Sequence, residues 1–228
     1  EEAIRRDIQD SLTGVASRTL LVNHLEQAIR RARRRSHYRF AVVFLGLDRF
    51  GLINESFGHE VGDMVLRTVA QRLEKALRKG DLVARFSGDE FVLFLDDLRE
   101  TDDVKKVLAK VTAELEVPIE ADGHQLTVSA CSGIVASSPN YNSAGDMLRD
   151  AGNALRRAKG RGRGRYEFFD TAMHRSVIAS LEMENDLRRA LEVGEFHLFY
   201  QPILSLATGR ILALEALLRW KHPERGWI

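Results

Sequence analysis

An acidic turn between two apolar runs is the segment that most restricts how this chain can fold. Residues 83–86 (VARF) and 91–95 (FVLFL) flank the four residues Ser87-Gly88-Asp89-Glu90. A glycine among small polar residues suits a tight β-hairpin, so the stretch predicts two paired strands with adjacent carboxylates held at the turn. Such carboxylates could bind a divalent metal, which phosphate chemistry commonly requires. The same residue types are also ordinary in solvated turns.

Further motifs lie in a fixed order with this hairpin. Asp10-Ser11-Leu12-Thr13-Gly14 is followed by Ser17-Arg18, and Phe57-Gly58-His59-Glu60-Val61-Gly62-Asp63 precedes the stretch from Arg85 to Phe91. With these motifs the chain resembles the GGDEF family, whose members condense two GTP molecules into cyclic di-GMP. The signature departs from the family pattern at its first position, where Ser87 replaces glycine.

A second resemblance begins near the end of the sequence. Phe199-Tyr200-Gln201-Pro202-Ile203 precedes Glu215-Ala216-Leu217-Leu218-Arg219-Trp220, which is similar to the opening of an EAL domain, the family of cyclic di-GMP phosphodiesterases. This resemblance implies that Glu215 is a metal ligand and that Gln201 and Arg219 contact the dinucleotide. One or two strands cannot close a barrel, so we expect no phosphodiesterase activity without the remainder of that EAL domain as a partner.

The composition excludes several classes of protein. The 228 residues are 44% hydrophobic, enough for a sizeable core, and a formal net charge of +1 argues against nucleic acid as the main partner. The longest strongly apolar run, residues 40–47, is too short to span a bilayer, and the first residues lack the apolar core of a signal peptide. We therefore expect a cytoplasmic segment without membrane contact, although the parent protein could be membrane-attached. The single Cys131 predicts a buried structural thiol.

The periodicity of the apolar residues predicts an α+β fold with a central, mostly antiparallel sheet flanked by helices and a ferredoxin-like core. The GGDEF resemblance implies the same fold, akin to nucleotide cyclases and polymerase palms. Helices are expected at residues 18–34, near 53, and at 61–78, 101–116 and 144–158, and strands at 40–47, 126–136 and 166–169 besides the hairpin. The expected domains are the end of an N-terminal linker helix (1–9), the GGDEF domain (10–170), a connecting helix (171–193) and a truncated start of an EAL domain (194–228).

The family resemblance assigns catalytic and metal roles around the hairpin. Asp89 is the implied metal ligand of the signature, and Glu90 is a second carboxylate close to the reacting hydroxyl. The first-strand metal ligand is absent, because Gly46 stands where the family has Asp, and Gly51 stands where a phosphate-contacting Lys is usual. Asp48 lies two residues from Gly46, on the same face of a strand, and could bind the metal instead. The implied cofactor is Mg²⁺ or Mn²⁺ if nucleotide is bound.

The substrate-binding positions are better preserved. Asn54 and Asp63 match the positions that read the guanine edge, since Asn offers a donor and an acceptor and Asp accepts from the N1 and N2 hydrogens. Without the resemblance, a helix or turn cap would be the preferred explanation of Asn54, and a place at the start of a helix that of Asp63; the resemblance reverses this preference. Lys159 and Arg163 match the late basic motif that holds the triphosphate. Gly164 departs from the family pattern, which usually has Asn there.

Arg78 and Asp81 fit the RxxD product-inhibition site of the family, at which cyclic di-GMP binds. Arg78 could hold a phosphate or stack on guanine, and Asp81 could accept a hydrogen bond from the base.

Three functions remain open at this point. The chain could be a degenerate GGDEF domain that binds GTP or cyclic di-GMP and regulates an attached EAL phosphodiesterase, which Gly46 and Gly51 favour. It could be an active diguanylate cyclase, which would bring two GTP sites together in a symmetric homodimer. It could also be a structural or dimerisation module that binds no nucleotide.

Overall fold

Seven consecutive buried residues form the central strand of the larger sheet. This strand, β1 (Ala41–Leu47), has the sequence AVVFLGL, and such a continuous apolar run is typical of a strand covered on both faces. β1 pairs antiparallel with β3 (Glu90–Leu95) along one edge and with β6 (Ala130–Ala136) along the other. The structure, a computed structural model, describes residues 8–35, 37–100, 103–169, 183, 186–191, 193–223 and 226–227.

The chain divides into two compact units, Glu1–His174 and Arg175–Ile228. In chain order, the first unit contains α2 (Arg18–Arg34), β1, α3 (Phe50–Phe57), α4 (His59–Ala76), β2 (Leu82–Ser87), β3, α5 (Asp103–Glu116), β4 (Ile119–Ala121), β5 (His124–Leu126), β6, α6 (Ala144–Gly160) and β7 (Tyr166–Phe168). The second unit contains β8 (Phe196–Leu204), β9 (Ile211–His222) and β10 (Gly226–Trp227).

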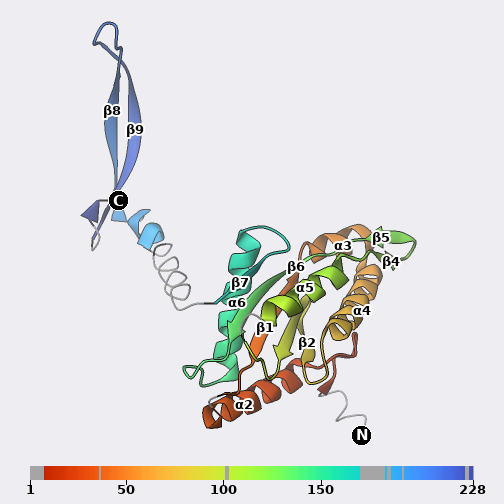
Figure 1. Ribbon diagram of the computed structural model, residues 1–228. Helices are drawn as coiled ribbons and strands as arrows, with labels where there is room; N and C mark the ends of the chain where they lie inside the picture. Colours follow the sequence, from red (N-terminus) through yellow and green to blue (C-terminus); the bar gives the residue numbers. More distant parts are fainter. Residues whose placement is uncertain are drawn as a thin grey trace. The chain divides into compact units, whose positions relative to one another are not determined.

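Helices cover both faces of a five-stranded sheet with the strand order β2-β3-β1-β6-β7 (Figure 1). Only the β6–β7 pair of this sheet is parallel. Val43 and Leu93 belong to the core that α4 and α5 cover, whereas Phe44 and Val92 belong to the core that α2 and α6 cover. The predicted α+β fold, a mostly antiparallel sheet flanked by helices, is therefore confirmed.

Most predicted elements form, with one clear error. The predicted helix at residues 18–34 has the bounds of α2, and the helix predicted at 144–158 continues to Gly160 as α6. The single strand predicted at 126–136 is wrong, because β5 pairs with β4 and ends before β6 begins to pair with β1. The strand β4 was not predicted, since three residues are too few to show a period.

Part of the predicted connecting helix at 171–193 lies outside the described residues. Those that are described, 183, 186–191 and 193, are helical. Within the described part of the chain, no helix is long and apolar enough to cross a membrane.

The second unit is built around the long antiparallel hairpin of β8 and β9. Its large apolar side chains are exposed, with Phe199 at 48%, Ile203 at 49% and Leu214 at 59%. Apolar surface of this kind is typical of a segment that packs against further protein.

β6 and α6 approach each other closely at Gly133. A Cβ atom at this position would lie 2.0 Å from the carbonyl oxygen of Ala151 and 2.2 Å from the amide nitrogen of Leu155. Gly133→Ala must therefore push the helix off the sheet, and we expect it to lower the free energy of unfolding by about 1–3 kcal/mol, measured by urea denaturation. The matched control is Gly152→Ala in α6, where no atom lies within 4 Å of the new Cβ and alanine is favoured by about 1 kcal/mol. Native stability of Gly133→Ala would contradict this packing.

Candidate functional site

The predicted acidic hairpin forms, and its turn is fastened to the N-terminal segment. Ser87 lies opposite Glu90, and its Oγ donates to Glu90 Oε2 at 2.9 Å. The Arg85 guanidinium donates to the Gly88 carbonyl oxygen, at 2.8 Å from Nη2 and 3.0 Å from Nε, and its Nη1 lies 3.2 Å from Asp10 Oδ1. The side chains of this ion pair are mostly buried, with exposures of 15% and 22%. Because it contacts both Gly88 and Asp10, Arg85 joins the turn to the N-terminal segment.

The carboxylate of Asp10 is itself held by several donors. It accepts hydrogen bonds from the Thr13 backbone N–H at 2.9 Å and from Thr13 Oγ1 at 2.6 Å. Burial by itself would raise the pKa of Asp10, but the hydrogen bonds from Thr13 and the positive charge of Arg85 outweigh it and lower the pKa below its usual value. This ion pair was not predicted from the sequence. The sequence signal for this pair was the presence of two opposite charges, Asp10 in the N-terminal motif and Arg85 just before the signature.

The end of β1 lies beside the hairpin turn. Gly46 is the cross-strand partner of Glu90, and the Leu47 N–H donates to the Asp89 carbonyl oxygen at 3.3 Å. Strand residues alternate between faces, so Gly46 and Glu90 belong to the face on which Phe44 packs against α2 and α6. The structure therefore places Glu90 beside the position where β1 lacks a carboxylate, and it places the backbone of Asp89 beside Leu47.

Asp48 is engaged on the other side of β1. Its Oδ2 accepts from Ser129 Oγ at 2.6 Å and from the Gly164 N–H at 2.9 Å, and its own N–H donates to the Ser129 carbonyl oxygen at 2.8 Å. Ser129 immediately precedes β6, and the strand order places β6 and β3 on opposite sides of β1. Asp48 thus fastens the glycine-rich basic segment that contains Gly164. The contribution of Ser129 was not predicted.

The side chains around β1 do not fit a preformed metal centre. Gly46 offers no ligand, and one oxygen of Asp48 already accepts two hydrogen bonds. Throughout the described ranges, no group of three or more His, Cys, Asp or Glu residues could hold a metal ion. A hard divalent cation takes about six oxygen ligands. The metal roles of Asp48 and Asp89 stay predictions.

The Cys131 thiol next to this site is a buried structural group, as predicted. Its Sγ donates to the Gly162 carbonyl oxygen at 3.2 Å. Burial raises the pKa of the Cys131 thiol, and the neighbouring Asp48 carboxylate raises it further. The protonated thiol is therefore favoured.

The two predicted guanine-reading residues lie next to each other. Asn54 is in α3 and Asp63 is in α4, and a Cβ atom on Gly62 would lie 1.9 Å from Asn54 Oδ1. The Asn54 side chain therefore lies against the backbone beside Asp63. Neither residue is a helix cap, because the N-cap of α3 is Arg49 and the N-cap of α4 is Gly58.

The predicted triphosphate-binding residues lie at the end of α6 and just after it. Lys159 is in the last turn of the helix and Arg163 follows it, and both residues are exposed. A Cβ atom on Gly46 would lie 2.7 Å from Lys159 Nζ, so the ammonium group lies over the end of β1. Arg161 is paired with Glu167.

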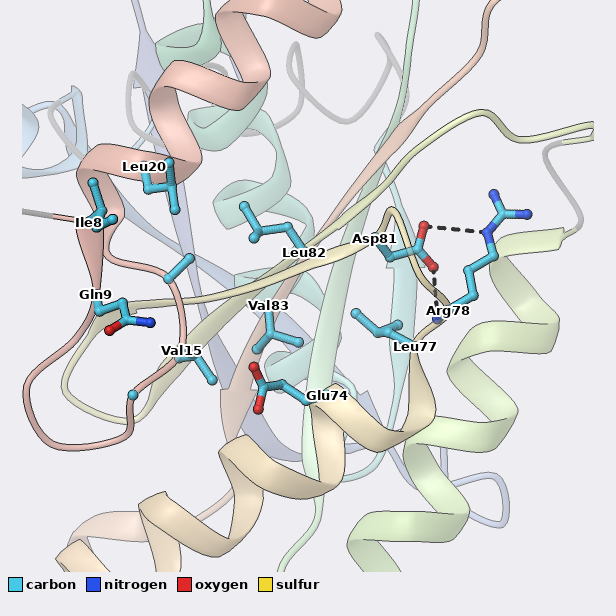
Figure 2. A pocket seen from close by; sticks show the side chains of 12 residues that line it. Ile8, Gln9, Val15, Leu20, Glu74, Leu77, Arg78, Asp81, Leu82 and Val83 are labelled. Carbon is cyan, nitrogen blue, oxygen red and sulfur yellow. Dashed lines mark hydrogen bonds and ion pairs between the residues drawn. The ribbon is translucent and has the colours of Figure 1, made fainter. Parts of the chain in front are cut away.

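The predicted product-inhibition pair is brought together at the edge of a pocket of about 310 Å³ between α4, β2 and the N-terminal segment (Figure 2). Arg78 Nε lies 3.5 Å from Asp81 Oδ1, and its guanidinium also donates to the carbonyl oxygens of Asp96 and Asp97. Asp81 accepts from the Asp96 N–H at 3.1 Å, and its side chain is only 2% exposed. Arg78, at 58% exposure, is thus the member that faces solvent. Ligand binding by the pair stays a prediction.

The three predicted EAL residues share one face of the β8–β9 hairpin. Gln201 is the direct cross-strand partner of Glu215, and Arg219 is the partner of His197. Glu215 and Arg219 are an even number of residues apart, so their side chains lie on the same face of β9.

The fold and the polar end of β1 define a nucleotide-cyclase-like α+β domain. A family model described as "Diguanylate cyclase, GGDEF domain" matches residues 7–165, and one described as "EAL domain" matches residues 184–228. The chain belongs to the GGDEF family and continues into an EAL segment, and these two families are those of cyclic di-GMP signalling.

Relatives from Pseudomonas aeruginosa have the same organisation in their sequences. The chain is 37% identical over 227 residues to the bifunctional diguanylate cyclase/cyclic di-GMP phosphodiesterase MucR, covering 100% of this chain and 33% of MucR. It is 38% identical over 221 residues to the cyclic di-GMP phosphodiesterase NbdA, covering 95% of this chain and 28% of NbdA. The chain thus spans about a third of the length of these relatives.

A solved GGDEF domain of TpbB (YfiN) from the same organism also has this fold. Its TM-score is 0.70 at 33% sequence identity, over 74% of this chain and 98% of that domain.

The Asp10–Arg85 ion pair predicts a pH-dependent contribution to stability. Because the folded-state pKa of Asp10 is lowered, this contribution is complete above the unfolded value of about 3.9 and is lost as the pH falls through the lower folded value. We therefore expect Asp10→Asn to lower the urea midpoint at about pH 7, and we expect its difference from the native chain to shrink towards about pH 3. The control is Asp122→Asn, at an exposed turn, which should change little at either pH. A difference for Asp10→Asn that is independent of pH would contradict the ion-pair explanation.

Proposed function

We propose that this GGDEF domain is a nucleotide-binding regulatory module that binds GTP, cyclic di-GMP or both and regulates an attached EAL phosphodiesterase. One contrast carries the proposal. The guanine-reading pair Asn54 and Asp63 is side by side, whereas Gly46 leaves the end of β1 without the carboxylate that the reaction needs. The residues proposed to bind guanine are therefore present, whereas a carboxylate needed for catalysis is missing.

Each predicted side chain has a defined role in binding the nucleotide. Asn54 and Asp63 bind the guanine edge through donors and acceptors that adenine does not match. Lys159 and Arg163 bind the triphosphate as charged donors beside flexible glycines. Any Mg²⁺ or Mn²⁺ arrives with GTP as its counterion, because the described residues contain no group of three or more side chains that could hold a metal ion.

The remaining partners follow from the same proposal. Arg78 is the exposed member of the pair that would hold cyclic di-GMP, and it would have to exchange its carbonyl partners for a phosphate. The rest of an EAL domain would cover the apolar side chains of β8 and β9. We place the module in the cytoplasm, where GTP is supplied.

A second candidate is a working diguanylate cyclase acting as a homodimer. The observation in its favour is that Glu90 is retained directly opposite Gly46, and that the relative MucR is named as a bifunctional enzyme. Losing one electrostatic contributor costs about 3–4 kcal/mol of transition-state stabilisation, so a slow enzyme would show a rate lower by about 10²–10³-fold.

Incubation of the protein at high concentration with GTP and MgCl₂ or MnCl₂, followed by chromatography, separates these candidates. We expect GTP to raise the thermal unfolding midpoint, because it binds only the folded state, and we expect no cyclic di-GMP to form. Gly46→Asp is the comparison, and any product it forms shows that the remaining machinery is competent. Product from the native chain would establish the cyclase instead. If neither GTP nor cyclic di-GMP shifts the midpoint, the domain is a structural module.

Gly62→Ala tests guanine recognition directly. The added methyl would occupy the place of the Asn54 amide oxygen and displace that side chain, so we expect GTP to bind about tenfold more weakly or worse by calorimetry. The matched control is Gly51→Ala in α3, where nothing lies within 4 Å of the new Cβ, and it should keep native affinity. Unchanged GTP affinity in Gly62→Ala would remove Asn54 from the site.

A further inference from the structure

An ammonium group occupies the space that a side chain at position 46 would need. The Cβ atom of any residue there would lie 2.7 Å from Lys159 Nζ and 2.8 Å from its Cε, which is closer than real Cβ contacts. Leu155 Cδ2 bounds the same space at 3.3 Å. The end of the Lys159 side chain therefore lies against the bare backbone of β1, in space that glycine leaves open.

The surroundings of this ammonium are polar but do not neutralise it. Across the described residues, no carboxylate forms an ion pair with Lys159 within 4.0 Å. Glu90 is on the same face as Gly46, and its Oε2 accepts from Ser87. Asp48, the other acidic side chain at this end of β1, is held by Ser129 and the Gly164 N–H on the opposite side of the strand.

Such an arrangement is unfavourable for a free divalent cation. A hard cation needs several oxygen ligands. Of the two acidic side chains Glu90 and Asp48, only Glu90 lies on the face over Gly46 without being held on the opposite side of the strand. A positive charge beside that position also repels a metal cation, whereas it attracts a phosphate. Lysine is suited to this task as a compact charge with three donors on a flexible stem.

We infer that Lys159, resting on Gly46, supplies the positive charge that the triphosphate requires at the end of β1, so that this site binds a guanine nucleotide without a divalent metal ion. The inference rests on the proposed function and adds to it a metal-independent mode of binding. Glycine at position 46 then serves recognition, because it makes room for the ammonium group.

Calorimetric titration of GTP in excess EDTA and in excess MgCl₂ tests the inference. We expect dissociation constants within about threefold of each other in the two conditions, and a loss of about tenfold or more in EDTA for Lys159→Met. The matched control is Arg157→Met, two residues away in α6, which removes one exposed positive charge but none over Gly46 and should keep affinity within about threefold. Equal thermal midpoints of the two variants establish that both are folded.

The outcomes separate this inference from the proposed function. Binding in MgCl₂ that disappears in EDTA overturns the inference and leaves the regulatory module standing. Equal affinity of Lys159→Met and Arg157→Met in EDTA also overturns it. The absence of GTP binding in both conditions overturns the inference, and the proposed function then depends on cyclic di-GMP binding alone.

A second readout needs no nucleotide. Titration with Mn²⁺, followed by electron paramagnetic resonance, should show no tight site in the native chain. The double variant Gly46→Asp/Lys159→Met replaces the ammonium by a carboxylate beside Glu90, and it should bind Mn²⁺ more tightly than the native chain. Tight Mn²⁺ binding by the native chain alone would overturn the inference.

Discussion

The enclosure of β1 is the constraint on which the rest of this structure depends. Each of its seven residues is buried, and each of its edges is hydrogen-bonded to an antiparallel neighbour. Helices cover both of its faces, so most of its side chains can serve only the core. The strand meets polar groups where it ends, at Gly46, Leu47 and Asp48. The candidate site therefore lies at one end of this strand, where the chain leaves the core.

The close packing of helices on this sheet explains why a change at one strand residue would displace a helix. Gly133 in β6 allows α6 to lie directly on the sheet, which fixes the height of the helix above β1. The last turn of α6 then stands over the end of β1, and Lys159 fills the space above Gly46. Asp48 holds the segment after α6 through the Gly164 N–H. Gly46, Lys159 and Asp48 are thus parts of one packing arrangement.

The long periodic elements could be predicted from the sequence because their signals are local. In α2, Leu21, Leu25 and Ile29 recur at helical spacing, and Ser17 caps the first turn by accepting from the Leu20 N–H. The division between β5 and β6 could not be predicted in this way. It depends on which neighbour each half pairs with, and no local pattern in residues 126–136 encodes that choice.

The site was predictable only in part, for a related reason. Motif positions identified Asp89, Glu90, Asn54 and Asp63, and the structure brings the first two to the end of β1 and the last two next to each other. The contacts that hold them join distant residues, such as Arg85 with Asp10 and Asp48 with Ser129. Periodicity and composition carry no information about such pairs, so their partners emerged only from the fold.

Under the proposed function, recognition and chemistry lie on different elements, which allows one to persist without the other. The side chains predicted to read guanine belong to α3 and α4, whereas the missing carboxylate belongs to β1. A positive charge that contacts the triphosphate equally in the ground state and in the transition state strengthens binding without accelerating the reaction. Under the proposed function, an ammonium group over glycine does this, because it binds the nucleotide but supplies no ligand for a metal ion that would activate the attacking hydroxyl. Under these proposals, glycine in place of a carboxylate at position 46 makes the end of β1 a binding position and not a catalytic one.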